Sequence, residues 1–419
     1  MRYMPGEALL AIHRHVGPVI SIGAKGFGYT LMLGPKANRF IFANGDAFSW
    51  AETFTTLIPA DGPNALMVSD GEDHRRRRSA VAPAFHHRQV DGYVRTMVAN
   101  TDAVIDTWRP GQRIDVYQQF RASVRRSVAE CLFGSRLAEL SDALGDELEP
   151  LLALTHLPPQ QVAVESRLGS PRWRRAMKNR TRVETLIDAA IVDARVAPRA
   201  DDRLLTALID GRPGIQPLSD NEIRDLVVSL IADGYETTSG VLAWAIYALL
   251  TVPGAWDAAA DEVHDVLGDR PPTAADLAAL TYVNGVVRET LRLYTPGVIS
   301  ARKAMRDLEF DGHRIQAGRI LIFSPYVTHR IPEIWPEPNE FRPQRWDPTS
   351  PYFQKPGPDE FIPFSGGLHR CIGSEMAMTE ITVTLARLIA RTTPRLPAQR
   401  IRPRHFGSLR PWPALLLDI

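Results

Sequence analysis

The sequence predicts a mainly α fold with a small β portion, in one domain that spans residues 1–419. Apolar residues recur at helical spacing over long stretches, whereas β-like runs are short and confined to two places. Hydrophobic residues make up 44% and charged residues 23% of the chain, which are ordinary values for one globular body. Although 419 residues would suggest two or three domains by length alone, no repeat, low-complexity tract or Gly/Ser linker divides them.

The β-like runs lie near the start of the chain and again after residue 304. YTLML (29–33) and RFIFA (39–43) have the composition of short strands. The strand pattern returns between residues 305 and 326, where Asp311 and Gly312 predict a hairpin turn. Helical periodicity predicts helices over residues 93–133, 173–195, 219–252, 254–267, 276–294 and 374–392.

Charge and composition exclude several classes of protein. A formal net charge of +1 gives no overall attraction to nucleic acid or anionic lipid. Cys131 and Cys371 lie too far apart for a disulfide framework, which favours a reducing compartment. The N-terminal apolar stretch ends at His13, and the longest uncharged apolar run, Val241–Val252, is shorter than the roughly 20 residues that span a bilayer. We therefore expect a cytoplasmic protein with no membrane span and no nucleic-acid partner.

The helix over residues 219–252 is long enough to cross the molecule. Ser219 and Glu222 form a capping-box start, and about 32 residues at 1.5 Å each give a length of roughly 48 Å. Its middle, DGYETTS, holds poor helix formers, Gly234 and Thr237 among them, and a threonine can bond back to a carbonyl one turn earlier. The patch is either a tolerated kink or a site for a small ligand and its protons.

Two other segments hold charges that could be surface features or buried ones. Glu289 and Arg292 share a helical face, and Arg345 in FRPQRW would join them in a buried clasp if that segment folds back. In DGEDHRRRRS, His74 and Arg78 share a face. Such a basic run is usually a solvated face and less often a nucleic-acid patch, but a bound dianion would be a better reason to direct some of these cations inward.

The segment FIPFSGGLHRCIG places Cys371 in a glycine-rich loop. An inert buried thiol, a zinc ligand and a hydrolase nucleophile are the alternatives. Zinc needs clustered ligands and only His369 is near, and a hydrolase needs an activating base that the pattern does not supply. Cys131, in SVAECLFGS, suits an inert buried thiol, whereas a glycine-rich loop offers Cys371 little apolar surface.

Together these segments resemble the cytochrome P450 family over nearly the whole chain. FSGGLHRCIG is similar to the family's heme-binding loop, ETLR to its ExxR motif, FRPQRW to the region that completes its Glu-Arg-Arg triad, and DGYETTS to its oxygen-activating stretch. The resemblance implies a long central helix over a buried heme. It is strongest to soluble bacterial members, above all actinobacterial ones.

The resemblance also implies roles for particular residues. Cys371 would be the proximal iron ligand, since a thiolate increases electron density on the iron and favours O–O cleavage. Phe364 would cover its sulfur, and Gly234 would lie beside the heme. The heme propionates would bind His74, Arg78, Arg302 and His369, although many members have tryptophan at the position of His74 and arginine at that of His369.

Asp233 departs from the family pattern, which has a small residue directly before the glycine of the oxygen-activating stretch. Its carboxylate either faces away from the heme, solvated or paired, or it alters proton delivery, or it selects a polar group on the substrate. Thr237 would organise water or oxygen, and Glu236 would help to supply protons.

The implied function is a heme-thiolate monooxygenase that inserts one oxygen atom of O2 into a lipophilic small molecule of secondary metabolism, by hydroxylation or epoxidation. Its cofactor would be heme b, and its electrons would come from NAD(P)H through a separate ferredoxin and ferredoxin reductase. A monomer is expected. The alternatives are a peroxide-driven or non-oxidative heme-thiolate enzyme and a heme-based ligand sensor. The expected pocket walls are Leu66, Met67, Val68, Leu230, Val298, Ile299, Ser300 and Leu409.

Overall fold

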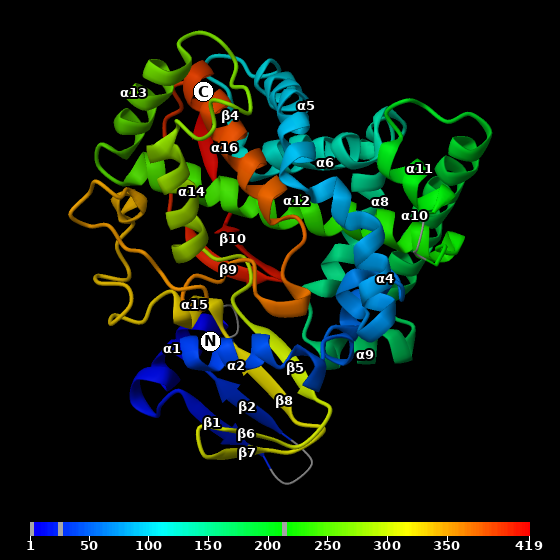
Figure 1. The fold of residues 1–419 in the computed structure, drawn as a ribbon. Helices are drawn as coiled ribbons and strands as arrows, with labels where there is room; N and C mark the ends of the chain where they lie inside the picture. Colours follow the sequence, from blue (N-terminus) through cyan, green and yellow to red (C-terminus); the bar gives the residue numbers. More distant parts are fainter. Residues whose placement is uncertain (1–3, 24–27, 212–215) are drawn as a thin grey trace.

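The computed structural model describes residues 4–23, 28–211 and 216–419, and it confirms a mainly α fold with small sheets. Helix α12 (Asp220–Thr251) runs through the middle of the helical part, and the largest sheet lies at one end of the molecule (Figure 1). Helices α6 (Val116–Phe133), α10 (Pro171–Val196), α14 (Thr281–Leu293) and α16 (Ser374–Arg391) pack against α12. This central helix therefore organises the main hydrophobic core.

The remaining helices surround this centre. They are α1 (Pro5–His15), α2 (Pro35–Ala43), α3 (Ile58–Asp61), α4 (Gly71–Val81), α5 (His87–Ile105), α7 (Ser135–Ala138), α8 (Ser141–Thr155), α9 (Pro159–Leu168), α11 (Arg203–Asp210), α13 (Ala255–Leu267) and α15 (Pro325–Thr328). The predicted helices at 173–195, 219–252, 254–267 and 374–392 correspond to α10, α12, α13 and α16. Helix α14 begins five residues later than the predicted start at 276.

The start of α12 has the expected capping box. The Ser219 hydroxyl accepts from the Glu222 N–H at 3.4 Å, and the Glu222 carboxylate accepts from the Ser219 N–H at 2.9 Å. Farther along, Thr237 and Thr238 donate to the carbonyls of Asp233 and Gly234, at 3.2 and 2.8 Å. The helix continues unbroken through these residues.

Two sequence predictions are wrong. The single helix expected over 93–133 is two helices, α5 and α6, because Pro110 and Gly111 interrupt it and the chain forms strand β4 (Arg113–Asp115) between them. RFIFA is not a strand but the second half of α2, whose first turn begins at Pro35 and whose buried face includes Ile41.

The strands form one larger sheet and three pairs. The sheet has the order β1 (Val19–Ile22), β2 (Tyr29–Met32), β8 (Ile320–Phe323), β5 (Ser300–Ala304), β3 (Phe48–Ser49). The pairs are β9 (Arg402–Phe406) with β10 (Ser408–Trp412), β4 with β11 (Leu416–Asp418), and β6 (Leu308–Phe310) with β7 (His313–Ile315). Asp311 and Gly312, with φ of 51° and 77°, make the predicted two-residue turn between β6 and β7.

Among the described residues, no single helix has both the length and the apolar character needed to cross a membrane. Helices α12 and α13 meet those criteria only as a pair, and that pair is bent by 108°.

Candidate active site around Cys371

Two side chains on one face of α12 are accessible although the middle of the helix is otherwise largely buried. Asp233 and Thr237 are exposed, whereas Tyr235 and Glu236 between them are buried. The Cys371 side chain is also exposed, yet burial raises the pKa of its thiol, and the charge of Asp233 raises it further. Groups that are accessible but desolvated line an enclosed space. We conclude that Cys371, Asp233 and Thr237 border the same space inside the fold.

The Cys371 loop is a closed turn that leads into α16. The Cys371 N–H donates to the Phe364 carbonyl at 2.9 Å, so the loop returns on itself at the cysteine. The Gly373 N–H donates to the sulfur and lowers the thiol pKa, opposing burial. Gly367 has φ of 67°, and a Cβ there would lie 2.7 Å from the Phe42 carbonyl oxygen. This glycine is therefore required by close packing on α2.

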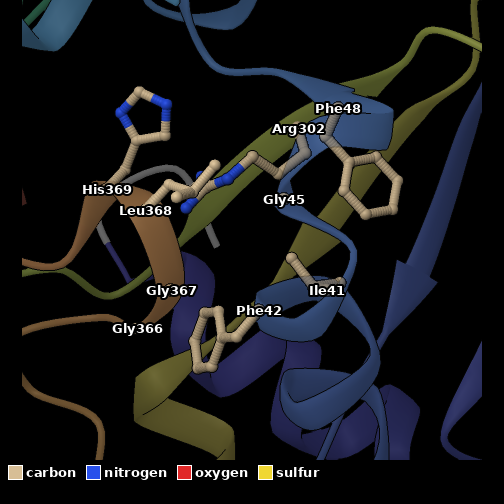
Figure 2. A pocket seen from close by; sticks show the side chains of 9 residues that line it. All are labelled: Ile41, Phe42, Gly45, Phe48, Arg302, Gly366, Gly367, Leu368 and His369. Atoms are coloured by element: carbon tan, nitrogen blue, oxygen red, sulfur yellow. The ribbon is translucent and has the colours of Figure 1, made fainter. Parts of the chain in front are cut away.

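Four basic side chains gather beside this loop. Arg302 of β5 is only 4% exposed, and its guanidinium lies 3.6 Å from the Trp50 ring centroid. The His369 ring stacks on the same tryptophan at 4.8 Å and lies 4.1 Å from the His74 ring. Figure 2 shows Arg302 reaching from its strand toward Leu368 and His369, across a small cavity that these residues line. Arg78 donates to the Arg370 carbonyl at 2.7 Å in the same loop.

The electrostatics of these four groups suit the binding of an anion. Burial lowers the pKa of Arg302 to about 9. Burial, followed by the charges of His369 and Arg78, lowers the pKa of His74 to about 4. Burial also lowers the pKa of His369 and of Arg78, although Asp70, 3.4 Å from His369, partly compensates. Two arginines and two neutral histidines supply charged and uncharged donors that fit the two carboxylates of a heme, so this part of the chain suits the implied cofactor.

Glu236 is buried and does not share the exposed face of Asp233 and Thr237. Its carboxylate is 6% exposed and accepts hydrogen bonds from Arg121 at 2.8 Å and Tyr117 at 2.5 Å, with Arg410 at 3.2 Å. Burial raises its pKa, but the charges of Arg121 and Arg410 and the hydrogen bond from Tyr117 together outweigh burial and hold the pKa below its usual range. The acid and threonine implied by the family resemblance therefore point in different directions.

Gly234 also faces away from the space. A Cβ at this position would lie 3.1 Å from a methyl group of Val128 on α6. The residue therefore allows the close approach of α6 to α12. Its expected position beside the heme stays a prediction.

Asp233 faces the enclosed space rather than bulk solvent, and burial raises its pKa to about 7. Its neighbour is Asp61, at the end of α3, which is 1% exposed. Sequence reasoning missed Asp61. The signal in the sequence is the single acidic residue in the otherwise apolar segment LIPADGP, followed directly by a glycine. In the structure, a Cβ on this glycine would clash with the Asp225 carboxylate, so the packing here is close.

The structure brings Glu289, Arg292 and Arg345 together in a buried clasp. The Glu289 carboxylate accepts from Arg292 at 2.8 Å and from Arg345 at 3.2 Å, and all three residues are at most 1% exposed. Trp346, which the sequence did not indicate, donates to the same carboxylate at 3.1 Å. The segment after α15 therefore folds back over α14.

The expected pocket residues have different environments. Leu66, Met67, Leu230, Ile299 and Ser300 are half-buried, and Val68 is buried. Val298 and Leu409 are each 1% exposed and pack with Tyr326 in a buried cluster, so their side chains belong to the core.

Comparisons with known proteins identify the family. The model of the family described as Cytochrome P450 matches residues 2–413. The chain is 65% identical to a protein named cytochrome P450 139 from Mycobacterium tuberculosis, over 100% of this chain and 98% of the relative. It is 32% identical to cyclooctatin synthase of Streptomyces melanosporofaciens, over 99% of this chain and 93% of the relative. The solved structure of retinoic acid-bound cyanobacterial CYP120A1 superposes with a TM-score of 0.86 at 26% identity, covering 97% of this chain and 92% of that one. The chain therefore belongs to the cytochrome P450 family, and it is a heme-dependent monooxygenase.

Proposed function

We propose that this cytochrome P450 inserts one oxygen atom of O2 into a lipophilic small-molecule substrate, by hydroxylation or epoxidation, within secondary metabolism. Its electrons come from NAD(P)H through a separate ferredoxin and ferredoxin reductase. The observation that carries the proposal is that Cys371 and Asp233 are accessible yet desolvated and act on each other electrostatically, with Thr237 exposed one turn after Asp233. The four basic groups beside the Cys371 loop provide the matching cofactor contacts.

The chain's own residues hold the cofactor. Cys371 provides the thiolate ligand, and the Gly373 N–H stabilises its negative charge. Arg302 and Arg78 bind the propionates as cations, while His74 and His369 donate hydrogen bonds. When bound, the heme supplies the activation of O2 and the oxygen insertion.

On α12, Thr237 is the hydroxyl that faces the space. It donates to the Asp233 carbonyl, which leaves its oxygen free to accept a hydrogen bond from water and to orient that water. Asp233 is the acidic group on the same face. Glu236 can supply protons to the space only if its ion pairs with Arg121 and Arg410 open, so in the observed arrangement it fixes the helix against α6.

The substrate class follows from the half-buried apolar residues and from the relatives. Leu66, Met67, Leu230 and Ile299 are partly accessible hydrophobic side chains. One relative is named for cyclooctatin, and the superposed structure binds retinoic acid. Both names denote lipophilic molecules, which supports a substrate of that kind.

The test uses purified holoprotein. Its reduced CO complex should show the strongly red-shifted Soret band of thiolate ligation, and Cys371→Ala should abolish that band while Cys131→Ala retains it. With ferredoxin, reductase and NAD(P)H, the protein should form an oxygenated product from a lipophilic substrate. Retention of the band in Cys371→Ala would refute the ligand assignment. Turnover with peroxide but none with ferredoxin, reductase and NAD(P)H would refute the proposed electron route.

A further inference from the structure

Asp233 differs from every other acidic residue of α12. Asp220, Glu222, Asp225 and Glu236 each pair with an arginine, respectively Arg195 at 2.9 Å, Arg77 at 2.9 Å, Arg180 at 2.7 Å and Arg121 at 2.8 Å. No lysine or arginine in the described part of the chain forms an ion pair with Asp233. The carboxylate that faces the enclosed space is thus the one for which the protein supplies no cation.

A second carboxyl group lies beside it. Asp61 is 1% exposed, and its Oδ2 has no hydrogen-bond partner among the described residues. Helix α3, which carries Asp61, packs on α12, and the charge of Asp233 acts on Asp61. An orphaned buried carboxylate oxygen next to an open space is costly unless a ligand or a proton satisfies it.

The nearest arginine cannot satisfy the pair. Arg180 donates to the Ala60 carbonyl at 2.6 Å, to Asp225 at 2.7 Å and to Glu184 at 2.9 Å, so its donors are engaged in holding α3 and α10 to α12. Its charge acts on Asp61, as do the charges of Asp233 and Asp225. Arg224 lies 4.0 Å from Asp225, but it also pairs with Asp188 at 3.0 Å. The local balance is negative unless protons or a cation are added.

Without a ligand, protons fill the deficit. Burial raises the pKa of Asp233 to about 7, and burial followed by the charge of Asp233 raises the pKa of Asp61 well above its usual range. A carboxyl group that is so nearly neutral ionises readily when a cation arrives. At the other α12 carboxylates an arginine supplies the positive charge. At Asp233 a cationic ligand can supply it.

We propose that Asp233, supported by Asp61, binds the protonated amine of a lipophilic substrate. The proposal rests on the proposed function, in which this space holds the substrate, and it adds the group by which that substrate is recognised. The ammonium donates to the Asp233 carboxylate, and the buried carboxyl group of Asp61 stays protonated nearby, so that the two carboxyl groups carry one negative charge for the ligand. The apolar part of the ligand then packs on the half-buried residues Met67 and Leu230.

The experiment measures binding to the ferric holoprotein without electron donors. N,N-dimethyldodecylamine, 1-dodecanol and dodecanoate share one chain length and differ in the charge of the head group. Spin-state titration and isothermal calorimetry should show the amine binding about 10- to 100-fold more tightly than the alcohol, the gain expected of one charge-assisted hydrogen bond. Dodecanoate should bind most weakly. A nitrogen bound to the iron would be recognised by its opposite spectral shift.

Variants locate the effect. Asp233→Asn should abolish the preference for the amine while it changes the affinity for the alcohol by less than about 3-fold. Asp233→Glu should keep the preference, and Asp61→Asn should reduce it. Asp220→Asn, the matched control, removes the same charge from the exposed start of the same helix and should leave the preference intact.

Equal affinities for amine and alcohol in the parent protein would overturn the proposal. A preference for 1-dodecanol would overturn it in favour of a neutral carboxyl pair that binds hydroxyl groups. Because no electron donor is present, an intact amine preference without any oxygenated product in the separate turnover assay would refute the proposed function and leave this inference standing.

Discussion

The clasp around Glu289 and the space beside Cys371 both hold charged side chains inside the protein, but only the clasp joins opposite charges in direct ion pairs. Glu289 is satisfied by two arginines and a tryptophan from the same chain. Beside Cys371, none of Arg302, His74 and Asp233 forms an ion pair with another described residue, although the charge of Asp70 acts on Arg302 and His74. The ion pairs of the clasp stabilise the fold. Charged groups without an ion pair, on two sides of one space, instead indicate where ligands bind.

The clasp should give the largest effect. Glu289→Ala leaves Arg292 and Arg345 buried without their carboxylate, which costs about 3 to 5 kcal/mol of the free energy of unfolding. Little folded holoprotein is expected, as measured by heme content, yield and thermal melting.

Glu340→Ala is the control for that variant, because Glu340 pairs with Arg342 at the surface. It should change the free energy of unfolding by less than about 1 kcal/mol. If the two variants were equally stable, the clasp would contribute no more to stability than a surface ion pair. The clasp could then not be contrasted with the unpaired charges beside Cys371.

Removing the charge of Arg302, which has no ion pair among the described residues, should weaken heme binding without unfolding the protein. Arg302→Met keeps the length and apolar contacts of the side chain but deletes a charged donor, so heme should dissociate about 10- to 100-fold faster. Transfer of heme to apomyoglobin measures this rate. Arg306→Met, which removes a largely exposed arginine two residues beyond β5, should leave it unchanged. Equal rates in the two variants would refute the propionate role.

The sequence predicts the closed network and the cysteine better than the open carboxyl pair. Glu289, Arg292 and Cys371 lie within short motifs whose spacing indicates their role. The direction in which Asp233 points depends instead on which neighbours pack on each face of α12: Val128 lies at Gly234, and Arg121 lies at Glu236. Asp61 lies far away in sequence, and only the packing of α3 on α12 brings it to Asp233.

Coupling of electron use to product formation tests the distal face. Thr237→Ala removes the hydroxyl that orients water, so product should fall about 10-fold while NAD(P)H consumption continues and more peroxide is released. Thr238→Ala is the matched control, because its hydroxyl bonds to the Gly234 carbonyl and its side chain is buried. If the two variants gave the same ratio of product to NAD(P)H consumed, the exposed position of Thr237 would not explain its role.

The smallest effect is the pH dependence of stability at Asp233. Because burial raises its pKa to about 7 from the usual 3.8, the folded protein holds a proton that the unfolded chain has released between these values. Stability must therefore fall as pH rises through this interval, and Asp233→Asn, which cannot ionise, should escape the loss. The melting temperature of the variant relative to the parent holoprotein should rise by about 1 to 3 °C between pH 5 and pH 8.

Asp220→Asn serves as the control for this pH effect, because Asp220 is a solvent-exposed carboxylate at the start of the same helix. The hydrogen bond from Arg195 lowers the pKa of Asp220, so this group is ionised in both states throughout pH 5 to 8 and its difference from the parent should stay constant. Asp61→Asn should behave like Asp233→Asn, because burial and the charge of Asp233 raise the pKa of Asp61 in the same direction. A constant difference for Asp233→Asn as well would mean that its carboxylate is as well solvated as that of Asp220. The space beside Cys371 would then be wet, and an entering ammonium would gain little there over water.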